Sequence, residues 1–132
     1  MKKVFLGGTC NGSDWRDRLI PLLKIDYFNP VVSDWNEESY QKELYERNNC
    51  DYCLYVITPK MTGVYSIAEV IDDSNKRPGK TLFCFITIDG EKTFLAPQLK
   101  SLQAVARMVE NNGGKVFDSY VEIANFLEKE NK

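Results

Sequence analysis

The sequence predicts an α/β protein in which one doubly wound domain, residues 1–132, has a five-stranded parallel sheet with helices on both faces. Apolar, β-prone runs alternate with polar or amphipathic stretches of helical length, and this alternation occurs five times. The runs at 51–57 and 81–88 are almost continuously apolar, as in strands that are covered on both faces. Strands that alternate with helices join by right-handed crossovers into a parallel sheet.

Each element can be placed in order along the chain. The strands are expected at 3–6, 27–32, 51–57, 81–88 and 115–117, and the helices at 13–24, 37–49, 64–76, 99–111 and 119–130. Ser13 and Asn36 are typical N-caps for the first two helices. Pro21 falls inside the first helix and is expected to kink it or to end it early. Pro30 removes a hydrogen-bond donor from the second strand, which is therefore expected at the sheet edge.

The last three helices each carry an apolar stripe with helical period. The residues expected to face the core are Ile67, Val70, Ile71, Ser74, Leu102, Val105, Ala106, Val109, Val121, Ile123, Ala124 and Leu127. Glu69 lies roughly opposite the stripe of its own helix on a wheel of 3.6 residues per turn. We therefore expect Glu69 to point away from the packing face of that helix.

The composition limits the chemistry that the chain can perform. The formal net charge is −2 with acidic and basic residues interleaved, so the basic stripe that binds long nucleic acid is missing. No apolar run approaches the roughly 20 residues of a membrane span, and we expect a cytoplasmic protein with a small-molecule partner. The sequence contains no histidine, which excludes Ser-His-Asp and Cys-His catalysis. Carboxylates, tyrosines and thiols are left to carry any chemistry.

The four cysteines are best explained as structural thiols. Cys84 lies within an apolar run, and Cys50 and Cys53 form a lone CxxC at a helix-to-strand junction. A redox pair at Cys50 and Cys53 is the alternative. A zinc site normally needs four ligands, so neither a metal nor another cofactor is expected.

In an open parallel sheet, ligands bind beyond the carboxyl ends of the strands. This rule selects the loops at 7–12, 33–36, 58–63 and 89–91. In the first loop, Gly7 and Gly8 allow a close approach of the backbone to a ligand, and Thr9 and Asn11 offer polar contacts to a sugar or phosphate. A tight turn between strand and helix explains these glycines equally well.

The loop at 58–63 leads directly into a helix. Thr62 and Gly63 precede the helix start, where free amides favour an anionic group and the Ser66 hydroxyl can contribute. Tyr65 could stack on a base or pack against the protein. Glu69 follows within the next turn and is a candidate for chemistry, although a solvated helix glutamate is the common alternative.

The loop at 33–36 pairs Asp34 with Trp35. A carboxylate beside a large flat ring suits a heterocycle, whose edge is hydrogen-bonded while its face is stacked. An aspartate that turns the chain and a tryptophan that covers the core are an equally good explanation.

The motif DYCLYVITP at 51–59, followed after ten residues by Glu69 in GVYSIAE, resembles the nucleoside 2-deoxyribosyltransferases, and especially their short "nucleoside 2-deoxyribosyltransferase-like" branch. FLGGTCN at 5–11, DYFNPVV at 26–32, DW at 34–35 and GVYSIAEVIDDSNKRP at 63–78 fit the same branch. The resemblance covers most of the chain. It implies a flavodoxin-like fold, which is Rossmann-like, and a homo-oligomer, most simply a dimer, that completes the site.

The resemblance also implies a double displacement on 2'-deoxynucleosides or their 5'-monophosphates. Glu69 would attack the anomeric carbon, expel the base and yield the sugar to a second base or to water, and an early helical position would keep it ionised at neutral pH. The family's base-side aspartate falls on Gly63, its strand-one tyrosine on Phe5 and its helix acid on Glu43. Asp34 is then a candidate for the base side. A catalytically silent nucleotide-binding or sensing module is the alternative function.

Overall fold

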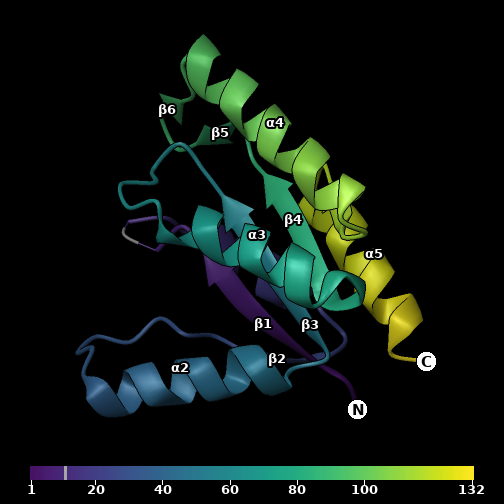
Figure 1. Ribbon diagram of the computed structural model, residues 1–132. Helices are drawn as coiled ribbons and strands as arrows, with labels where there is room; N and C mark the ends of the chain where they lie inside the picture. Colours follow the sequence, from purple (N-terminus) through teal and green to yellow (C-terminus); the bar gives the residue numbers. More distant parts are fainter. Residues whose placement is uncertain (11) are drawn as a thin grey trace.

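A computed structural model describes residues 1–10 and 12–132. The strands of its main sheet are β1 (Lys3–Gly8), β2 (Asp26–Phe28), β3 (Tyr52–Ile57), β4 (Thr81–Phe85) and β7 (Lys115–Phe117). The α-helices are α1 (Trp15–Leu19), α2 (Glu37–Asn49), α3 (Tyr65–Lys76), α4 (Ala96–Asn111) and α5 (Tyr120–Glu130), and Figure 1 shows their arrangement.

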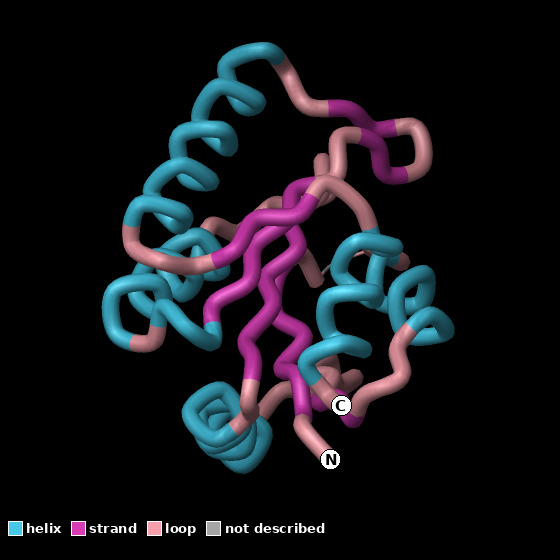
Figure 2. Tube along the Cα trace, turned by 90° about the vertical axis from the view of Figure 1, so that its right-hand side faces the viewer, coloured by secondary structure: helices cyan, strands magenta, loops and turns pink. Residues whose placement is uncertain are grey.

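Within the described residues the main sheet has five parallel strands in the order β2-β1-β3-β4-β7. Helices cover both of its faces (Figure 2). The predicted α/β architecture is confirmed, and the strand order is that of a flavodoxin-like fold. The chain runs outward from β1 to β2 and then returns past β1 to β3. The strand order therefore reverses between β1 and β3, which is where such folds bind ligands.

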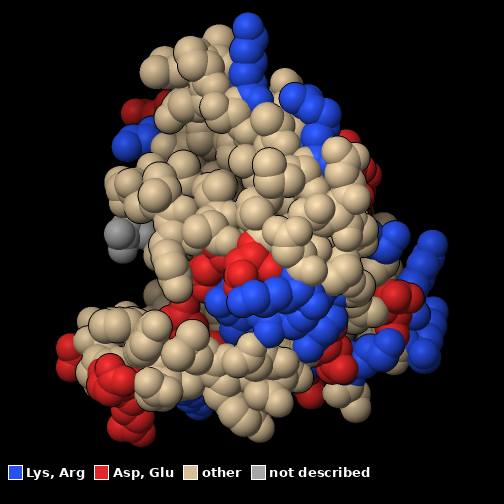
Figure 3. Space-filling model, viewed as in Figure 1, with Lys and Arg blue, Asp and Glu red and all other residues tan. Residues whose placement is uncertain are grey.

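Helix α2 is polar throughout and lies beside α3. Asn36 caps it, as predicted, by accepting a hydrogen bond from the backbone N–H of Ser39 at 2.9 Å. Because α2 has no apolar stripe, charged groups rather than a hydrophobic seam join it to α3. Figure 3 shows acidic and basic side chains meeting between these two helices.

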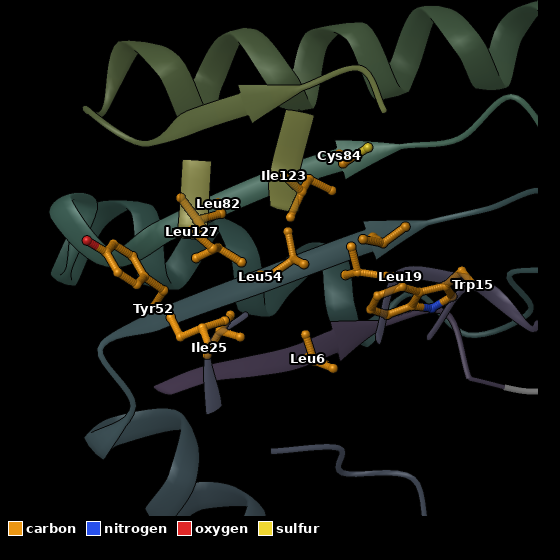
Figure 4. Packing of buried hydrophobic residues seen from close by; sticks show 12 residues of the cluster. Leu6, Trp15, Leu19, Ile25, Tyr52, Leu54, Leu82, Cys84, Ile123 and Leu127 are labelled. Atoms are coloured by element: carbon orange, nitrogen blue, oxygen red, sulfur yellow. The ribbon is translucent and has the colours of Figure 1, made fainter. Parts of the chain in front are cut away.

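Two hydrophobic clusters pack against the two faces of the sheet. Figure 4 shows the first, in which Trp15 and Leu19 of α1 and Leu127 of α5 surround Leu54 of β3. The second joins β1, β3 and β4 to the inner faces of α3 and α4; its buried members are Phe5, Cys50, Cys53, Tyr55, Ile57, Val70, Phe83, Phe94, Leu102, Ala106 and Val109. Every residue of β3 is buried because both faces of this strand are covered. Truncating Leu54 to alanine should therefore cost about 2–5 kcal/mol.

The first helix begins one residue later than expected. Asp14 is the N-cap of α1, without a side-chain capping bond, so the prediction of Ser13 as N-cap is wrong. The hydroxyl of Ser13 instead accepts from the Trp15 N–H at 3.3 Å and donates to Asp89 at 2.6 Å. Pro21 ends the α-helix early, as predicted, because a 3₁₀ turn at Ile20–Leu22 replaces its continuation.

Two strands are shorter than their apolar runs suggested. Strand β2 lies at the sheet edge, as predicted, but stops at Phe28, two residues before Pro30. Strand β4 stops at Phe85, and the end of its run forms a small antiparallel hairpin of β5 (Ile88–Asp89) and β6 (Lys92–Thr93). Gly90 turns this hairpin with a φ of +63°.

One core assignment was wrong in the last helix. Val121 is exposed, whereas Ile123, Ala124 and Leu127 of the same helix are buried. Two positions along a helix correspond to about 200° of rotation, which carries Val121 away from the stripe that starts at Ile123.

In the described part of the chain no helix combines the length and the apolar character needed to cross a membrane.

Candidate functional site

A cavity of about 240 Å³ opens at the carboxyl edge of the sheet, between β1 and β3. Its walls come from the loop after β1, the loop after β3, the first turns of α3, and single residues of α1, α2 and the segment after β2. The lining residues are Gly7, Gly8, Thr9, Cys10, Arg16, Pro30, Glu43, Ile57, Met61, Thr62, Gly63, Tyr65, Ser66 and Glu69. The structure thus brings together most of the residues that the sequence singled out, although Asn11 lies outside the described residues.

A second cavity of about 370 Å³ adjoins the first. It is lined by Cys10, Pro30, Val31, Val32, Trp35, Tyr40, Glu43 and Tyr65. Its wall is rich in aromatic rings, and the Trp35 and Tyr40 ring centroids lie 5.4 Å apart at an interplanar angle of 60°. Trp35 is 59% exposed, so it is free to contact a ligand and does not cover the core. Asp34 does not line either cavity, and its part in the chemistry stays a prediction.

The two cavities meet at shared residues. Cys10, Pro30, Glu43 and Tyr65 line both of them. Glu43 comes from α2, and it is the residue on which the helix acid of the family falls in the sequence. A group that spans the junction would therefore lie beside the Glu43 carboxylate.

Glu69 is more enclosed than its position on α3 suggested. It is 8% exposed, because α2 covers the side of α3 that its apolar stripe leaves open. The Nε of Arg47 lies 3.7 Å from its Oε2. Burial raises the pKa of Glu69 to about 7; Arg47 opposes this rise, whereas Glu43 and Asp73 add to it. This pKa lies above the one that an early helical position was expected to favour, because burial disfavours the charged carboxylate.

Arg47 of α2 anchors the region beneath Glu69. Its Nε donates to the Tyr55 hydroxyl at 3.0 Å, and its Nη2 donates to Asp73 at 2.9 Å, to Asp72 at 3.1 Å and to the Glu69 carbonyl at 3.3 Å. The Tyr55 hydroxyl donates to the other oxygen of Asp73 at 2.5 Å. The network ties the backbone of α3 at Glu69 to both α2 and β3. Nothing in the sequence marks Arg47, because an arginine in a polar helix is ordinary.

The glycines of the site have different physical explanations. Gly8 has a φ of +118°, and a Cβ there would lie 2.1 Å from the carbonyl oxygen of Val56. The close pairing of β1 with β3 thus requires glycine at this position. A Cβ at Gly63 would have no neighbour within 4 Å, so this position leaves open space beside the cavity.

The loop at 89–91 braces the site and does not line either cavity. The hydroxyls of Ser13 and Thr58 both donate to Asp89 at 2.6 Å, and the Lys60 ammonium lies 3.7 Å from the same carboxylate. Lys60 also donates to the Gly12 carbonyl at 3.1 Å. Asp89 therefore fixes the loops that follow β1 and β3 relative to each other.

All four cysteines are free thiols. Cys50 and Cys53 are buried, and burial raises the pKa of each to about 12. A reactive redox pair needs a thiol with a lowered pKa. The structure therefore favours the structural explanation of this CxxC, while Cys10 is exposed in the site.

The fold and the cavity define an α/β protein with a cavity at the topological switch point and a buried carboxylate in that cavity. Residues 1–87 of the 132 match the family described as "nucleoside 2-deoxyribosyltransferase like". The chain belongs to this family, as its motifs indicated, and membership supports a general glycosyl-transfer function. No curated protein matches the chain. The matched segment contains every residue that lines the two cavities.

Proposed function

We propose that the protein breaks the N-glycosidic bond of 2'-deoxynucleosides or their 5'-monophosphates, by transfer or hydrolysis, through a covalent glycosyl-Glu69 intermediate. The observation that carries this proposal is the place of Glu69: its carboxylate is buried in the cavity at the switch point, in a chain of this family.

The shapes of the two cavities suggest how such a ligand lies. The aromatic wall formed by Trp35, Tyr40 and Tyr65 suits the flat base, which stacks on rings. The first cavity, which contains the Glu69 and Glu43 side chains and Thr9, suits the sugar. The glycosidic bond then falls at the junction of the two cavities, beside Glu43.

The chemistry requires two displacements at the anomeric carbon. In the first, a Glu69 oxygen forms a bond to C1', and the C1'–N bond breaks with its electron pair leaving on the base. In the second, the nitrogen of another base or the oxygen of water attacks C1', and the Glu69 carboxylate is released. The attacking base nitrogen or water must also lose a proton in this second step, and the departed base, which left with the electron pair, can accept it. Arg47 holds the Glu69 backbone and carboxylate in place for both steps.

We assign Glu43 as the acidic residue that acts on the base as the glycosidic bond breaks. Its carboxyl lines both cavities, whereas Asp34 lines neither. Exchanging Glu43 for glutamine should therefore slow base release more than exchanging Asp34 for alanine does. Equal losses in the two variants would return Asp34 to the candidates for this role.

A silent binding module is the second candidate. It is favoured by the pKa of about 7 for Glu69, which leaves about half of the molecules without an ionised nucleophile at neutral pH, and by the glycine at position 63. Such a protein would bind a nucleoside or nucleotide in the same cavities and leave it intact.

One experiment separates the two candidates. The protein is incubated with nucleosides and nucleotides that stabilise it in a thermal-shift screen, and free base is measured by chromatography. A 2-fluoro-2-deoxy nucleoside should then add one sugar mass to the peptide that contains Glu69. Glu69→Gln should abolish both signals, with Glu91→Gln, an exposed position, as the control. Full activity in Glu69→Gln would end the double-displacement proposal, and binding without any release of base would favour the silent module.

A further inference from the structure

Arg16 is a charged residue of the cavity that the proposed reaction does not use. It belongs to α1 and is 5% exposed, with its side chain lining the cavity. Its Nε donates to the Leu6 carbonyl at 3.0 Å, and its Nη1 donates to the Thr9 carbonyl at 2.7 Å. Its Nη2 lies 4.0 Å from the sulfur of Cys10. A guanidinium has five N–H groups, so the two carbonyls and the Cys10 sulfur leave one further N–H on Nη1 and one on Nη2 for another acceptor.

The charge of Arg16 has no close counter-ion. Among the residues that the structure describes, no carboxylate lies within 4 Å of its guanidinium. Arg47, the other buried arginine, has Asp72 and Asp73 at that distance. Buried cations are normally paired, and an arginine cannot escape the cost by losing its proton. The cavity thus contains a desolvated positive charge.

The N-terminus of α3 contributes to the same cavity. This helix has 12 residues, its N-cap Val64 makes no side-chain capping bond, and its first turn contains no acidic residue. The first two helical residues, Tyr65 and Ser66, line the cavity. Their backbone N–H groups have no acceptor within the helix, and the helix dipole favours negative charge at this end.

We propose that Arg16 and the N-terminus of α3 bind the phosphate of a nucleoside 5'-monophosphate. The inference rests on the proposed function and names its substrate class. A phosphate matches the guanidinium fork and accepts hydrogen bonds from the helix amides and the Ser66 hydroxyl.

The carboxylates of the cavity fix the direction of the ligand. Glu69 lies on α3 and repels a phosphate, so the anion lies against Arg16 and the uncharged sugar against Glu69, whereas Glu43 interacts with the Arg16 charge and lies at the junction of the two cavities. Ser66 precedes Glu69 by three residues, or about one helical turn, which places the phosphate and the nucleophile on neighbouring turns of α3. The base then reaches the aromatic cavity beyond Glu43.

Binding measurements test this assignment without depending on turnover. The Glu69→Gln protein is titrated by calorimetry with a 2'-deoxynucleoside and with its 5'-monophosphate, for each of the four common bases. For the accepted base, the monophosphate should bind about tenfold tighter or more, because hydrogen bonds to charged groups are strong. Adding Arg16→Gln should remove this preference, because it should weaken binding of the monophosphate far more than binding of the nucleoside. Arg18→Gln, at an exposed arginine of the same helix, is the matched control and should retain the preference.

The outcomes are distinct. Equal affinities for the two ligands in the Glu69→Gln protein would overturn the inference. So would an Arg16→Gln variant that binds both ligands more weakly but keeps the preference, since Arg16 would then only support the loop. Should Arg16→Gln fail to fold, a crystal structure of Glu69→Gln with the monophosphate decides: a phosphate on Arg16 supports the inference, and a phosphate elsewhere refutes it.

The same experiments can refute the proposed function without refuting this inference, and the reverse. A protein that binds the monophosphate through Arg16 but releases no base would retain this inference and lose the enzymatic proposal. Release of base from nucleosides, with no preference for the monophosphate, would do the reverse.

Discussion

At the scale of single residues, the buried Glu69 is expected to lower the stability of the folded protein at and above neutral pH. Its pKa in the folded protein is about 7, against an ordinary value of 4.5. Between these values the folded protein holds the proton more tightly than the unfolded chain does, so the contribution of Glu69 to stability is largest below pH 4.5 and is lost as the pH rises through 7.

Glu69→Gln should therefore stabilise the protein at pH 8, by about 1–2 kcal/mol or several degrees in melting temperature. At pH 5, where the folded protein already carries the proton, the gain should be much smaller. Thermal denaturation at both pH values measures this difference, with Glu91→Gln as the exposed control. A Tm gain of equal size at both pH values would contradict the raised pKa.

Gly63 offers a second prediction at this scale. A Cβ there meets open space, and its φ lies outside the positive range that disfavours other residues. Gly63→Asp restores the carboxyl that the family resemblance places six residues before the nucleophile. Base release should rise about tenfold to a hundredfold, since a positioned acid typically contributes that much or more. Gly63→Asn has the same shape without the acid, and an equal rise in both variants would exclude acid catalysis as its cause.

At the scale of elements, the contact between α2 and α3 controls the nucleophile. Arg47→Gln removes the cation that opposes the rise in the Glu69 pKa and leaves Asp73 buried with fewer partners. The free energy of unfolding should fall by about 3 kcal/mol. Because the ionised carboxylate is the reactive form, turnover should rise with pH around a midpoint of about 7, and the variant should move this midpoint upward.

The pH dependence of base release measures the midpoint directly. Arg47→Lys retains the positive charge and should return the midpoint toward 7, whereas Arg107→Lys, at an exposed position of α4, should change nothing. An Arg47→Gln protein that is folded but has an unchanged midpoint would show that Arg47 supports the helices alone.

The order of the elements could be predicted from the sequence because strands and helices differ in the period of their apolar residues. Their ends were harder to place, since they depend on partners that are distant in the chain. The N-cap of α1 is Asp14 and not Ser13, whose hydroxyl bonds to Asp89, 76 positions away in the chain. The apolar run after β4 turns into a hairpin because the neighbouring strand β3 ends at Ile57.

The site was predictable where it follows from topology and not where it follows from tertiary contact. The rule of strand ends selected the two loops that line the first cavity, with Thr9, Thr62 and Gly63 among their residues. The burial of Glu69 was not visible, because α2 covers it through charged residues that leave no apolar signal. Arg16 was missed for a related reason: its burial depends on how α1 packs against β1.

At the scale of the whole molecule, a homodimer remains a prediction. The burial of Glu69 gives no reason for it, since α2 already covers this residue within one subunit. Val64 and Tyr65 at the start of α3, next to the site, and Leu95 before α4 are exposed apolar residues, and a second copy would cover such a surface. Light scattering at high micromolar concentration should give twice the mass of 15.2 kDa. A monomer at that concentration would contradict the prediction.

The family match and the residues of both cavities end before β5. Within the described residues, positions 88–132 line neither cavity, yet they provide α4, β7 and α5, which complete the core on both faces. Apart from Asp89, which fixes the loops of the site, the residues that line the cavities and the elements that complete the core thus lie in consecutive stretches of the chain. The C-terminal third could therefore be exchanged between members of the family. Such a chimera would take its thermal stability from one parent and its ligand preference from the other.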